Sequence, residues 1–160
     1  MNTPSSEEIK LKVVLTSSHA KVPTRKTDMA AGMDLYATET KILPPGETKL
    51  FDTNLRIECP PLFFLKIEEK SSLAYFESIG VRAGIIDCDY RGTIKVLLEN
   101  FGKCEKKISH GQAIAQIIMV PYIKPKLKIA RSLSKTNRGY SAFGLEHSFQ
   151  RCSLNTSDID

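Results

Sequence analysis

The loop at residues 87–92 carries the side chains best suited to catalysis. It holds two acids, an aromatic ring and an arginine between two apolar runs. Apolar walls around Asp87 would position its carboxylate as a general base for water, and Tyr90 offers a flat face for a sugar or a base. A purely structural hairpin would more simply use Asn-Gly or Asp-Gly. The alternative is a polar hairpin tip with no catalytic role.

Two further stretches combine positive charge with other groups that bind phosphate. Lys70, Ser71 and Ser72 place a cation and two hydroxyls at the expected start of a short helix, where backbone N–H groups and the helix dipole favour an anion. Near the end of the chain, a flexible arm could bring Arg138 to a phosphate and stack Phe143 on a base. The alternatives are ordinary helix capping and a disordered tail.

An acid and an amide complete the set of candidate polar groups. Asp34 follows Gly32 at the expected start of a strand, where its carboxylate could hold a hydrated cation or orient a basic partner. Gln116 lies in an otherwise apolar run, and a buried amide needs hydrogen-bond partners from the protein or from a ligand. A surface turn and a structural amide are the respective alternatives.

Short apolar runs must position these groups, because they recur between turn signals along most of the chain. Their spacing of roughly 8–12 residues, with little helical periodicity, predicts an all-β sandwich or barrel. One short helix is expected after Lys70, with Ser71 or Ser72 as its N-cap. The expected strands are Leu11–Leu15, Thr53–Cys59, Leu62–Glu68, Ile79–Ile86, Thr93–Glu99, Ala113–Val120 and Leu127–Ala130.

The composition is that of a single globular domain. The 160 residues are 41% hydrophobic and 26% charged, close to the averages for soluble proteins. No apolar run approaches the roughly 20 residues of a membrane helix, and the N-terminus lacks a basic-then-apolar signal. The four cysteines and three histidines have no metal-ligand spacing. We therefore expect a cytoplasmic or nuclear protein with reduced thiols that is not secreted.

Positive charge is concentrated in the C-terminal part of the chain. The net charge is +5, but nine basic residues and one acidic residue lie between Lys103 and Arg138, a local excess of +8. Such a stretch could meet a polyphosphate or a nucleic-acid backbone. The alternative is a solvated basic face.

In order and together, five stretches resemble the motifs of the trimeric dUTPase family, the deoxyuridine 5′-triphosphate nucleotidohydrolases. The resemblance runs from about Pro23 to Gly144. Its most specific match is GIIDCDYRG at residues 84–92, and AGMDL at residues 31–35 is moderately specific. It implies a jelly-roll or distorted β-barrel subunit that forms a homotrimer with shared active sites. The domains would be an N-terminal segment with the first strand (1–22), the barrel core (23–137) and a C-terminal arm with a polar tail (138–160).

The implied activity is Mg²⁺-dependent hydrolysis of dUTP to dUMP and pyrophosphate, which keeps uracil out of DNA and supplies dUMP for dTMP synthesis. By the resemblance, Asp87 activates the water that attacks the α-phosphorus, and Asp34 contacts Mg²⁺ through water. Arg138 would reach the γ-phosphate. The other implied substrate-binding residues are Lys70, Ser71, Ser72, Gly84, Ile85, Ile86, Tyr90, Lys95, Gln116, Phe143 and Gly144, with Ser71, Ser72 and Gln116 contributed by a neighbouring subunit.

Three of the five motifs depart from the family pattern. Lys70 replaces an arginine and loses its bidentate fork, and Gln112 replaces an aspartate. In the fifth motif Ser141 and Ala142 replace glycines, and residues 145–147 read Leu-Glu-His in place of Ser-Thr-Gly. Because Glu146 puts a negative charge where the family places a γ-phosphate donor, we predict retained uracil specificity and a weaker grip on the triphosphate.

Three other functions remain as alternatives. A sister family with the same fold deaminates dCTP, but the position of its catalytic glutamate is Leu97 here, which argues against deamination. A catalytically weakened homologue could act as a regulatory or interaction protein. A nucleic-acid-binding barrel would rest on the basic stretch alone, so we do not expect nucleic acid as a partner.

Overall fold

The computed structural model describes residues 9–139, which form ten strands and one short helix joined by loops. The chain divides after Lys124 into residues 1–124 and residues 125–160, and each part is described by itself. No helix among the described residues is long and apolar enough to span a membrane. The elements are β1 (Lys12–Leu15), β2 (Met33–Tyr36), β3 (Lys41–Leu43), β4 (Thr48–Glu58), β5 (Phe63–Glu68), α1 (Ser71–Glu77), β6 (Ile79–Arg82), β7 (Ile85–Ile86), β8 (Ile94–Asn100), β9 (Lys106–Ile108) and β10 (Ala113–Pro121).

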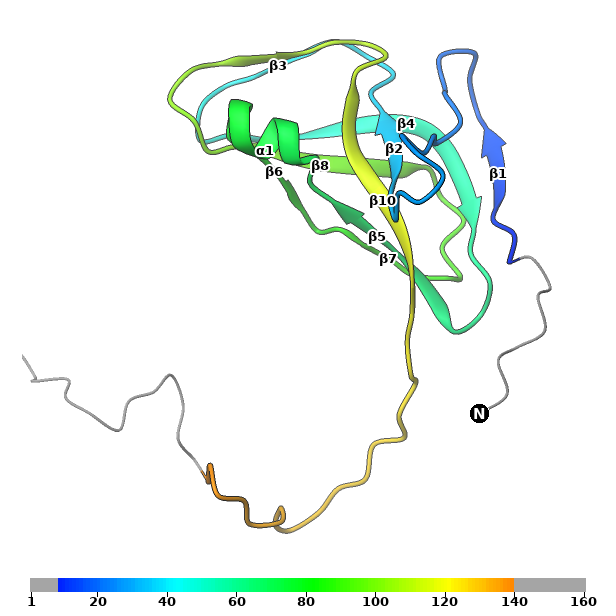
Figure 1. Cartoon of the computed structure of the whole chain (residues 1–160), viewed down its shortest axis with the longest axis vertical. Coiled ribbons are helices and arrows are strands. Elements are labelled where there is room, and N and C mark those ends of the chain that lie inside the picture. The colour runs from blue at the N-terminus through cyan, green and yellow to red at the C-terminus, as the bar shows by residue number, and fades with distance from the viewer. Residues whose placement is uncertain (1–8, 140–160) are drawn as a thin grey trace, which may run out of the picture. The chain divides into compact units, whose positions relative to one another are not determined.

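Two four-stranded sheets and a two-stranded sheet make up residues 9–124 (Figure 1). The first sheet has the order β1-β4-β8-β6, the second has the order β2-β10-β5-β7, and β3 pairs with β9. Every pair of neighbouring strands is antiparallel. This all-β jelly-roll architecture confirms the predicted fold class.

A single hydrophobic core joins the two larger sheets. Burial alternates along β4 and β8, as expected for strands with one face toward the core. Phe51 and Val96 are fully buried from the first sheet, and Leu65 and Ile117 are fully buried from the second. All four belong to the same cluster of buried side chains.

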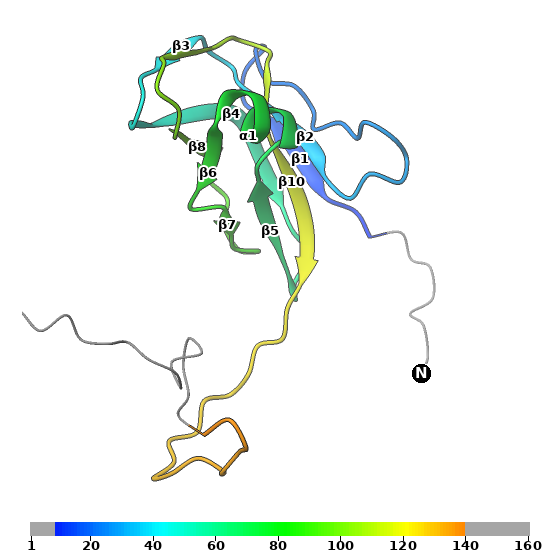
Figure 2. The same cartoon turned by 60° about the vertical axis from the view of Figure 1, so that its left-hand side comes forward.

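The strand β4 bends where its pairing partner changes. Its pairing with β8 is interrupted between Asp52 and Leu55, and Asn54 has a positive φ of 50°. The Asp52 carboxylate accepts the Asn54 N–H at 2.7 Å and stabilises this irregularity. Beyond it, β4 pairs with β1 through residues 55–58. The curved ribbon of β4 is visible in Figures 1 and 2.

The expected strand Ile79–Ile86 is two strands in different sheets, which corrects the sequence prediction. Ala83 has a positive φ of 52°, and a Cβ atom on Gly84 would lie 2.3 Å from the Ile67 carbonyl oxygen. The chain therefore turns at Ala83, and Gly84 allows its backbone to pack directly on β5. As a result β6 belongs to the first sheet and β7 to the second.

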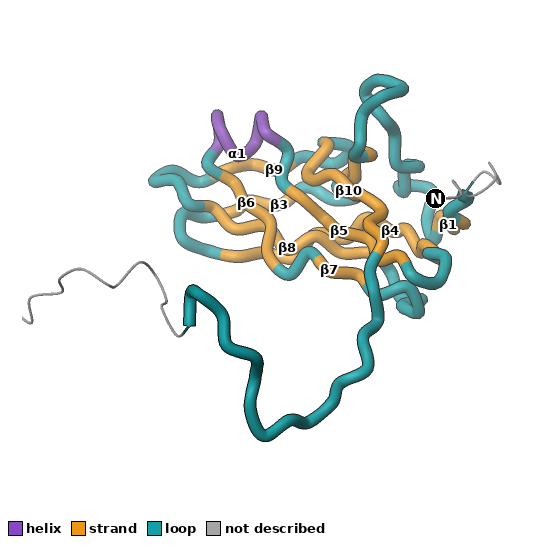
Figure 3. The backbone as a smooth tube through the Cα atoms, turned by 60° about the horizontal axis from the view of Figure 1, so that its bottom comes forward, coloured by secondary structure: helices purple, strands orange, loops and turns teal. Residues whose placement is uncertain are grey.

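Two other predictions about local structure were wrong. The segment Leu127–Ala130 is not a strand, and Leu127 and Ile129 are almost fully exposed because no neighbouring strand pairs with them in the described residues. The helix α1 forms where expected, at one end of the strands (Figure 3). Its N-cap residue is Lys70, however, and no side chain caps the helix.

Candidate active site

The loop between β7 and β8 is held in shape by its own arginine and by one from β4. The Arg91 guanidinium donates to the carbonyl oxygens of Cys88 at 2.8 Å and Tyr90 at 3.0 Å. Arg56 then donates from Nε to the Arg91 carbonyl oxygen at 2.6 Å. Sequence reasoning gave neither arginine a role, because both act on main-chain groups that come together only in the folded loop.

Tyr90 is folded back onto the loop by contacts at the hydroxyl end of its side chain. Its hydroxyl donates to the Thr93 carbonyl oxygen at 3.1 Å. A Cβ atom on Gly92 would lie 2.3 Å from the same hydroxyl oxygen, so any side chain here would displace the Tyr90 ring. The ring thereby forms one wall of a cavity of about 200 Å³, which is lined by Ile85, Ile86, Asp87, Tyr90, Thr93 and Lys95.

Asp87 lies where this cavity meets a second one. The second cavity has a volume of about 250 Å³ and is lined by Phe64, Ile85, Asp87 and Tyr122. The walls of both cavities are mainly apolar, and Asp87 itself is exposed, so water can reach its carboxylate, which is suited to accept a proton. Thr93, which sequence reasoning missed, lines the first cavity beside five residues that were expected there.

Tyr122 stays protonated beside this carboxylate. Its hydroxyl lies 3.9 Å from the Cys88 thiol. This contact, together with burial and the negative charges of Asp87 and Asp89, raises the pKa of Tyr122 above its usual value. The phenol therefore remains a neutral hydrogen-bonding group at physiological pH.

Lys95, an exposed member of the cavity wall, is paired with an acid from β4. Its Nζ lies 3.5 Å from an Asp52 carboxylate oxygen, and the side chain is about half exposed. Asp52 also fixes the bend of β4, so Lys95 is held at the rim of the cavity rather than extended into solvent.

A second group of candidate residues gathers where β2, β10 and the end of β5 meet. Lys70 Nζ lies 2.5 Å from the Asp34 carboxylate, and both side chains are partly buried. Gln116 donates from Nε2 to the Glu69 carbonyl oxygen at 2.9 Å. Its amide packs against Gly32, where a Cβ atom would lie 2.2 Å from Gln116 Oε1. The Gln116 amide therefore has a protein partner, in agreement with one of the two sequence interpretations.

Ser71 and Ser72 adjoin this second group at the start of α1, and both residues are exposed. Since α1 has only seven residues, its dipole adds little, and the two hydroxyls and Lys70 are the groups that could meet an anion there. Arg138 belongs to the part of the chain after Lys124 and is described apart from both groups. Phe143 and Gly144, like the altered fifth-motif positions at residues 141–147, lie outside the described residues.

Comparison with known proteins identifies the family. A family model described as dUTPase matches residues 18–146. The deoxyuridine 5′-triphosphate nucleotidohydrolase of vaccinia virus (strain Copenhagen) is 39% identical over 134 residues, which cover 84% of this chain and 90% of that protein. The monkeypox virus protein of the same name is 38% identical, with 84% and 88% covered. This chain belongs to the dUTPase family.

Solved dUTPase structures share the fold. The dUTPase of Staphylococcus bacteriophage 80alpha, in a mutant form with dUpNHpp, has a TM-score of 0.80 and 24% identity, with 84% of this chain and 96% of that chain covered. A mutant dUTPase from phage phi11 of S. aureus, described with a structural Mg(II) ion, has a TM-score of 0.75 and 22% identity, with 79% and 99% covered.

The donor set of this dUTPase chain suits a magnesium ion that arrives with a nucleotide. Within residues 9–139, no three His, Cys, Asp or Glu side chains form a metal-binding group. Asp34 offers one carboxylate, which is shared with Lys70. Mg²⁺ keeps several waters and is commonly bound through one or two carboxylates together with substrate phosphates. A single carboxylate therefore fits this mode and does not form a cage for the ion alone.

Proposed function

We propose that the chain hydrolyses dUTP to dUMP and pyrophosphate, with Asp87 as the general base. The observation that carries this proposal is the position of Asp87 in the wall of a cavity of about 200 Å³, beside Tyr90 and Lys95. The Asp87 carboxylate takes a proton from water as the water oxygen bonds to the α-phosphorus. The bond from that phosphorus to the bridging oxygen of the β-phosphate breaks, and pyrophosphate leaves.

The hairpin would select the nucleotide by its shape and its main-chain groups. Uracil would lie against the backbone of Gly84, Ile85, Ile86 and Lys95, which can exclude a thymine methyl group and mismatch a cytosine edge. Tyr90, fixed by its hydrogen bond to Thr93, would pack on the deoxyribose. Its fixed ring would leave no room for a 2′-hydroxyl.

The phosphate-binding group would come from another subunit of a homotrimer. Asp87 follows Ile86, which pairs with Leu65 on β5, so Asp87 lies beside Phe64. Gln116 pairs with Glu68, four residues or roughly 13 Å further along β5. A triphosphate with its α-phosphorus at Asp87 does not span this distance. We therefore infer that Ser71, Ser72 and Gln116 serve the Asp87 site of a neighbouring subunit.

Asp34 would hold Mg²⁺ through water next to these phosphates, and the ion would neutralise charge on the triphosphate. The ion pair between Lys70 and Asp34 must open before Asp34 can hold the hydrated ion. A phosphate group can attract Lys70 away from Asp34, which frees the carboxylate for the hydrated ion. Because that exchange replaces an existing interaction, it supports a weaker grip on the triphosphate. Arg138, Phe143 and Gly144 would close over the γ-phosphate and the uracil as an arm.

Release of pyrophosphate from dUTP, with and without Mg²⁺, tests the proposal. We expect Asp87→Asn to retain nucleotide binding and to lower turnover by about two or more orders of magnitude, since loss of a general base typically costs 10²–10⁴-fold. Glu105→Gln removes an acid that lines neither cavity and should leave turnover unchanged. Wild-type turnover in Asp87→Asn would remove Asp87 from the mechanism.

The same assay tests whether the chain is specific for uracil and whether it is catalytically active at all. We expect dUTP to be hydrolysed well ahead of dCTP and dTTP. Equal turnover of all three would contradict a uracil-specific pocket. A wild-type chain that binds dUTP and releases no pyrophosphate would favour a weakened homologue with a regulatory role.

A further inference from the structure

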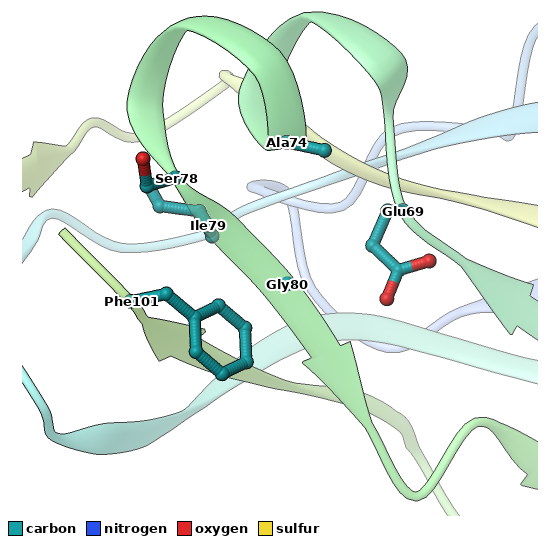
Figure 4. A pocket seen from close by; sticks show the side chains of 6 residues that line it. All are labelled: Glu69, Ala74, Ser78, Ile79, Gly80 and Phe101. Carbon is teal, nitrogen blue, oxygen red and sulfur yellow. The ribbon is translucent and has the colours of Figure 1, made fainter.

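A cavity of about 400 Å³ lies between α1, β6 and the end of β8, and none of its lining residues belongs to the proposed active site. It is lined by Glu69, Ala74, Ser78, Ile79, Gly80 and Phe101 (Figure 4). Ala74 comes from α1, and Ser78 is the left-handed residue that ends this helix. In Figure 4 Glu69 and Phe101 flank the β6 ribbon at Gly80.

Small residues keep this cavity open. Gly80 lacks a side chain, and a Cβ atom there would lie 2.5 Å from Cε2 of the Phe101 ring. The Phe101 backbone is fixed by its N–H, which donates to the Ser78 carbonyl oxygen at 2.8 Å. The ring is 56% exposed, so a ligand could contact it without displacing other side chains.

The charged group of the cavity is the Glu69 carboxylate, and Ser78 is a second polar residue in the lining. Glu69 Oε1 accepts the Val81 N–H at 3.2 Å, and within residues 9–139 its carboxylate forms no ion pair. The neighbouring cation, Arg82, forms its ion pair with Glu99, and the charge of Glu69 adds a smaller contribution to its raised pKa. The Arg82 guanidinium also lies 5.1 Å from the centre of the Phe101 ring, which shows that this ring accepts a planar cation.

We propose that this cavity binds a guanidinium or ammonium group carried on a short apolar stem. Glu69 would pair with the charge, Phe101 would contact the cation through its ring, and Ala74 and Ile79 would contact the stem. An anion would be repelled by the carboxylate. A neutral apolar molecule would remove the carboxylate from water without supplying a positive charge, which is costly.

Such a group occurs both in small organic cations and in the basic side chains of peptides. Two exposed aromatic residues on α1 could provide further contacts for a peptide. Tyr75 and Phe76 are 82% and 74% exposed, and their rings meet edge to face with centroids 4.8 Å apart. Apolar residues that flank a basic side chain could pack on this pair, as aromatic anchors do in protein interfaces.

The site goes beyond the proposed hydrolysis and does not depend on it. Gln116 hydrogen-bonds the main-chain oxygen of Glu69, whereas the cavity uses the side chain. Binding here and pyrophosphate release are measured separately, so either can fail while the other holds.

Titration of the full-length protein with n-butylguanidinium, followed by amide NMR shifts, tests the site. We expect saturable shifts at Ala74, Ile79 and Gly80 over about 1–10 mM ligand. The uncharged analogue n-butylurea has nearly the same shape and should bind at least about tenfold more weakly. Absence of saturable shifts at these residues, or equal binding of both compounds, would overturn the proposal.

Variants of the carboxylate show whether the charge is recognised. Glu69→Gln keeps an oxygen for the Val81 N–H and should weaken n-butylguanidinium binding by at least about tenfold. Glu68→Gln is the matched control, because Glu68 pairs with Lys66 and lines no part of the cavity; its binding should match wild type. Undiminished binding by Glu69→Gln would overturn the proposal.

A capped Leu-Arg-Leu tripeptide separates the two sources. Tighter binding of this peptide than of n-butylguanidinium, lost in a Tyr75→Ser/Phe76→Ser variant, identifies a peptide side chain as the occupant. Weaker binding of the peptide in wild type identifies a small organic cation. Both results require Glu69, and a peptide that binds equally well to Glu69→Gln would count against the site.

Discussion

At the scale of single residues, the loop that carries Asp87 depends on an arginine outside it. Arg56 on β4 holds the Arg91 carbonyl oxygen, and Arg91 holds two further carbonyl oxygens of the loop. Arg56 lines neither of the two cavities that meet at Asp87. Its effect on turnover would therefore pass through the position of Asp87, which makes it a positioning residue.

We predict that Arg56→Gln lowers kcat for dUTP by about fivefold with a smaller change in KM, because one such hydrogen bond contributes about 1 kcal/mol. Arg56→Lys, which retains a charged donor, should be intermediate. Steady-state kinetics check this, with thermal unfolding as a control for overall stability. An unchanged kcat in Arg56→Gln would show that the loop keeps its shape without β4.

The buried thiol of Cys59 makes the folded state less stable at alkaline pH. Cys59 is almost fully buried, and burial, with a smaller effect of Cys88, raises the pKa of its thiol above the ordinary value of 9.0. Above pH 9 the unfolded chain loses this proton before the folded chain does, so the free energy of unfolding falls as pH rises.

We predict that thermal stability declines between about pH 9 and the higher pKa of folded Cys59, and that this part of the decline is absent in Cys59→Val. Melting temperatures from pH 7.5 to 10.5 in reducing buffer check this. Cys104→Val is the control, because Cys104 is exposed and should leave the slope unchanged. Equal slopes in wild type and Cys59→Val would assign the decline to other groups.

At the scale of elements, the tight crossing from β6 to β7 fixes where the hairpin lies. The Ile67 N–H donates to the Gly84 carbonyl oxygen at 2.7 Å, and the absence of a side chain on Gly84 permits that approach. A methyl group there would meet main-chain atoms of β5, which cannot move aside as a side chain could.

We predict that Gly84→Ala lowers the free energy of unfolding by about 1–3 kcal/mol, as overpacking typically does, and also reduces dUTP turnover by displacing Ile85. Gly46→Ala is a useful control. Gly46 has a φ of 74° and open space around it, so its cost should be about 1 kcal/mol of backbone strain with turnover intact. Urea unfolding and kinetics on both variants check this. A stable and active Gly84→Ala would mean that β7 can shift.

Alternation of apolar residues predicted most of the strands, and the exceptions have identifiable causes. The start of β4 and the three residues of β3 and of β9 follow turn signals closely and are too short or too polar to show a period. The division of residues 79–86 into two strands depends on the left-handed backbone of Ala83, which the sequence does not indicate because alanine rarely adopts it. Leu127–Ala130 alternates as a strand does, yet pairing requires a neighbour that the described residues do not supply.

The candidate site was predictable in its residue types and not in its arrangement. Asp87, Tyr90 and Lys95 line one cavity as expected. The pairing of Lys70 with Asp34 joins residues 36 positions apart, and no local pattern reveals such a contact. Thr93 and Arg56 were missed for the same reason, since their roles arise from main-chain groups of the folded loop.

At the scale of the whole molecule, the separation of the two groups of residues along β5 predicts that subunits share their sites. A chain with Asp87→Asn and a chain with Ser71→Ala/Ser72→Ala should each be inactive alone. Coexpressed at equal levels, they should regain about a quarter of wild-type turnover. Each site takes its Asp87 from one subunit and its serines from another, and each of these is intact in about half of the subunits. Native mass spectrometry verifies that the trimers mix. Mixed trimers without activity would place both groups in the site of one chain.

The length of β5 has a consequence for how such a chain can change over time. The strand has six residues, Phe63–Glu68; Asp87 lies beside its start and Lys70 follows its end. Side chains along the strand alternate between its two faces with a period of two. Insertion of a single residue would turn Leu65 or Ile67 outward and shift Lys70 by about 3 Å. The number of residues in β5 thus determines the distance between Asp87 and Lys70. We therefore expect length differences among related proteins to occur in connecting loops and not in this strand.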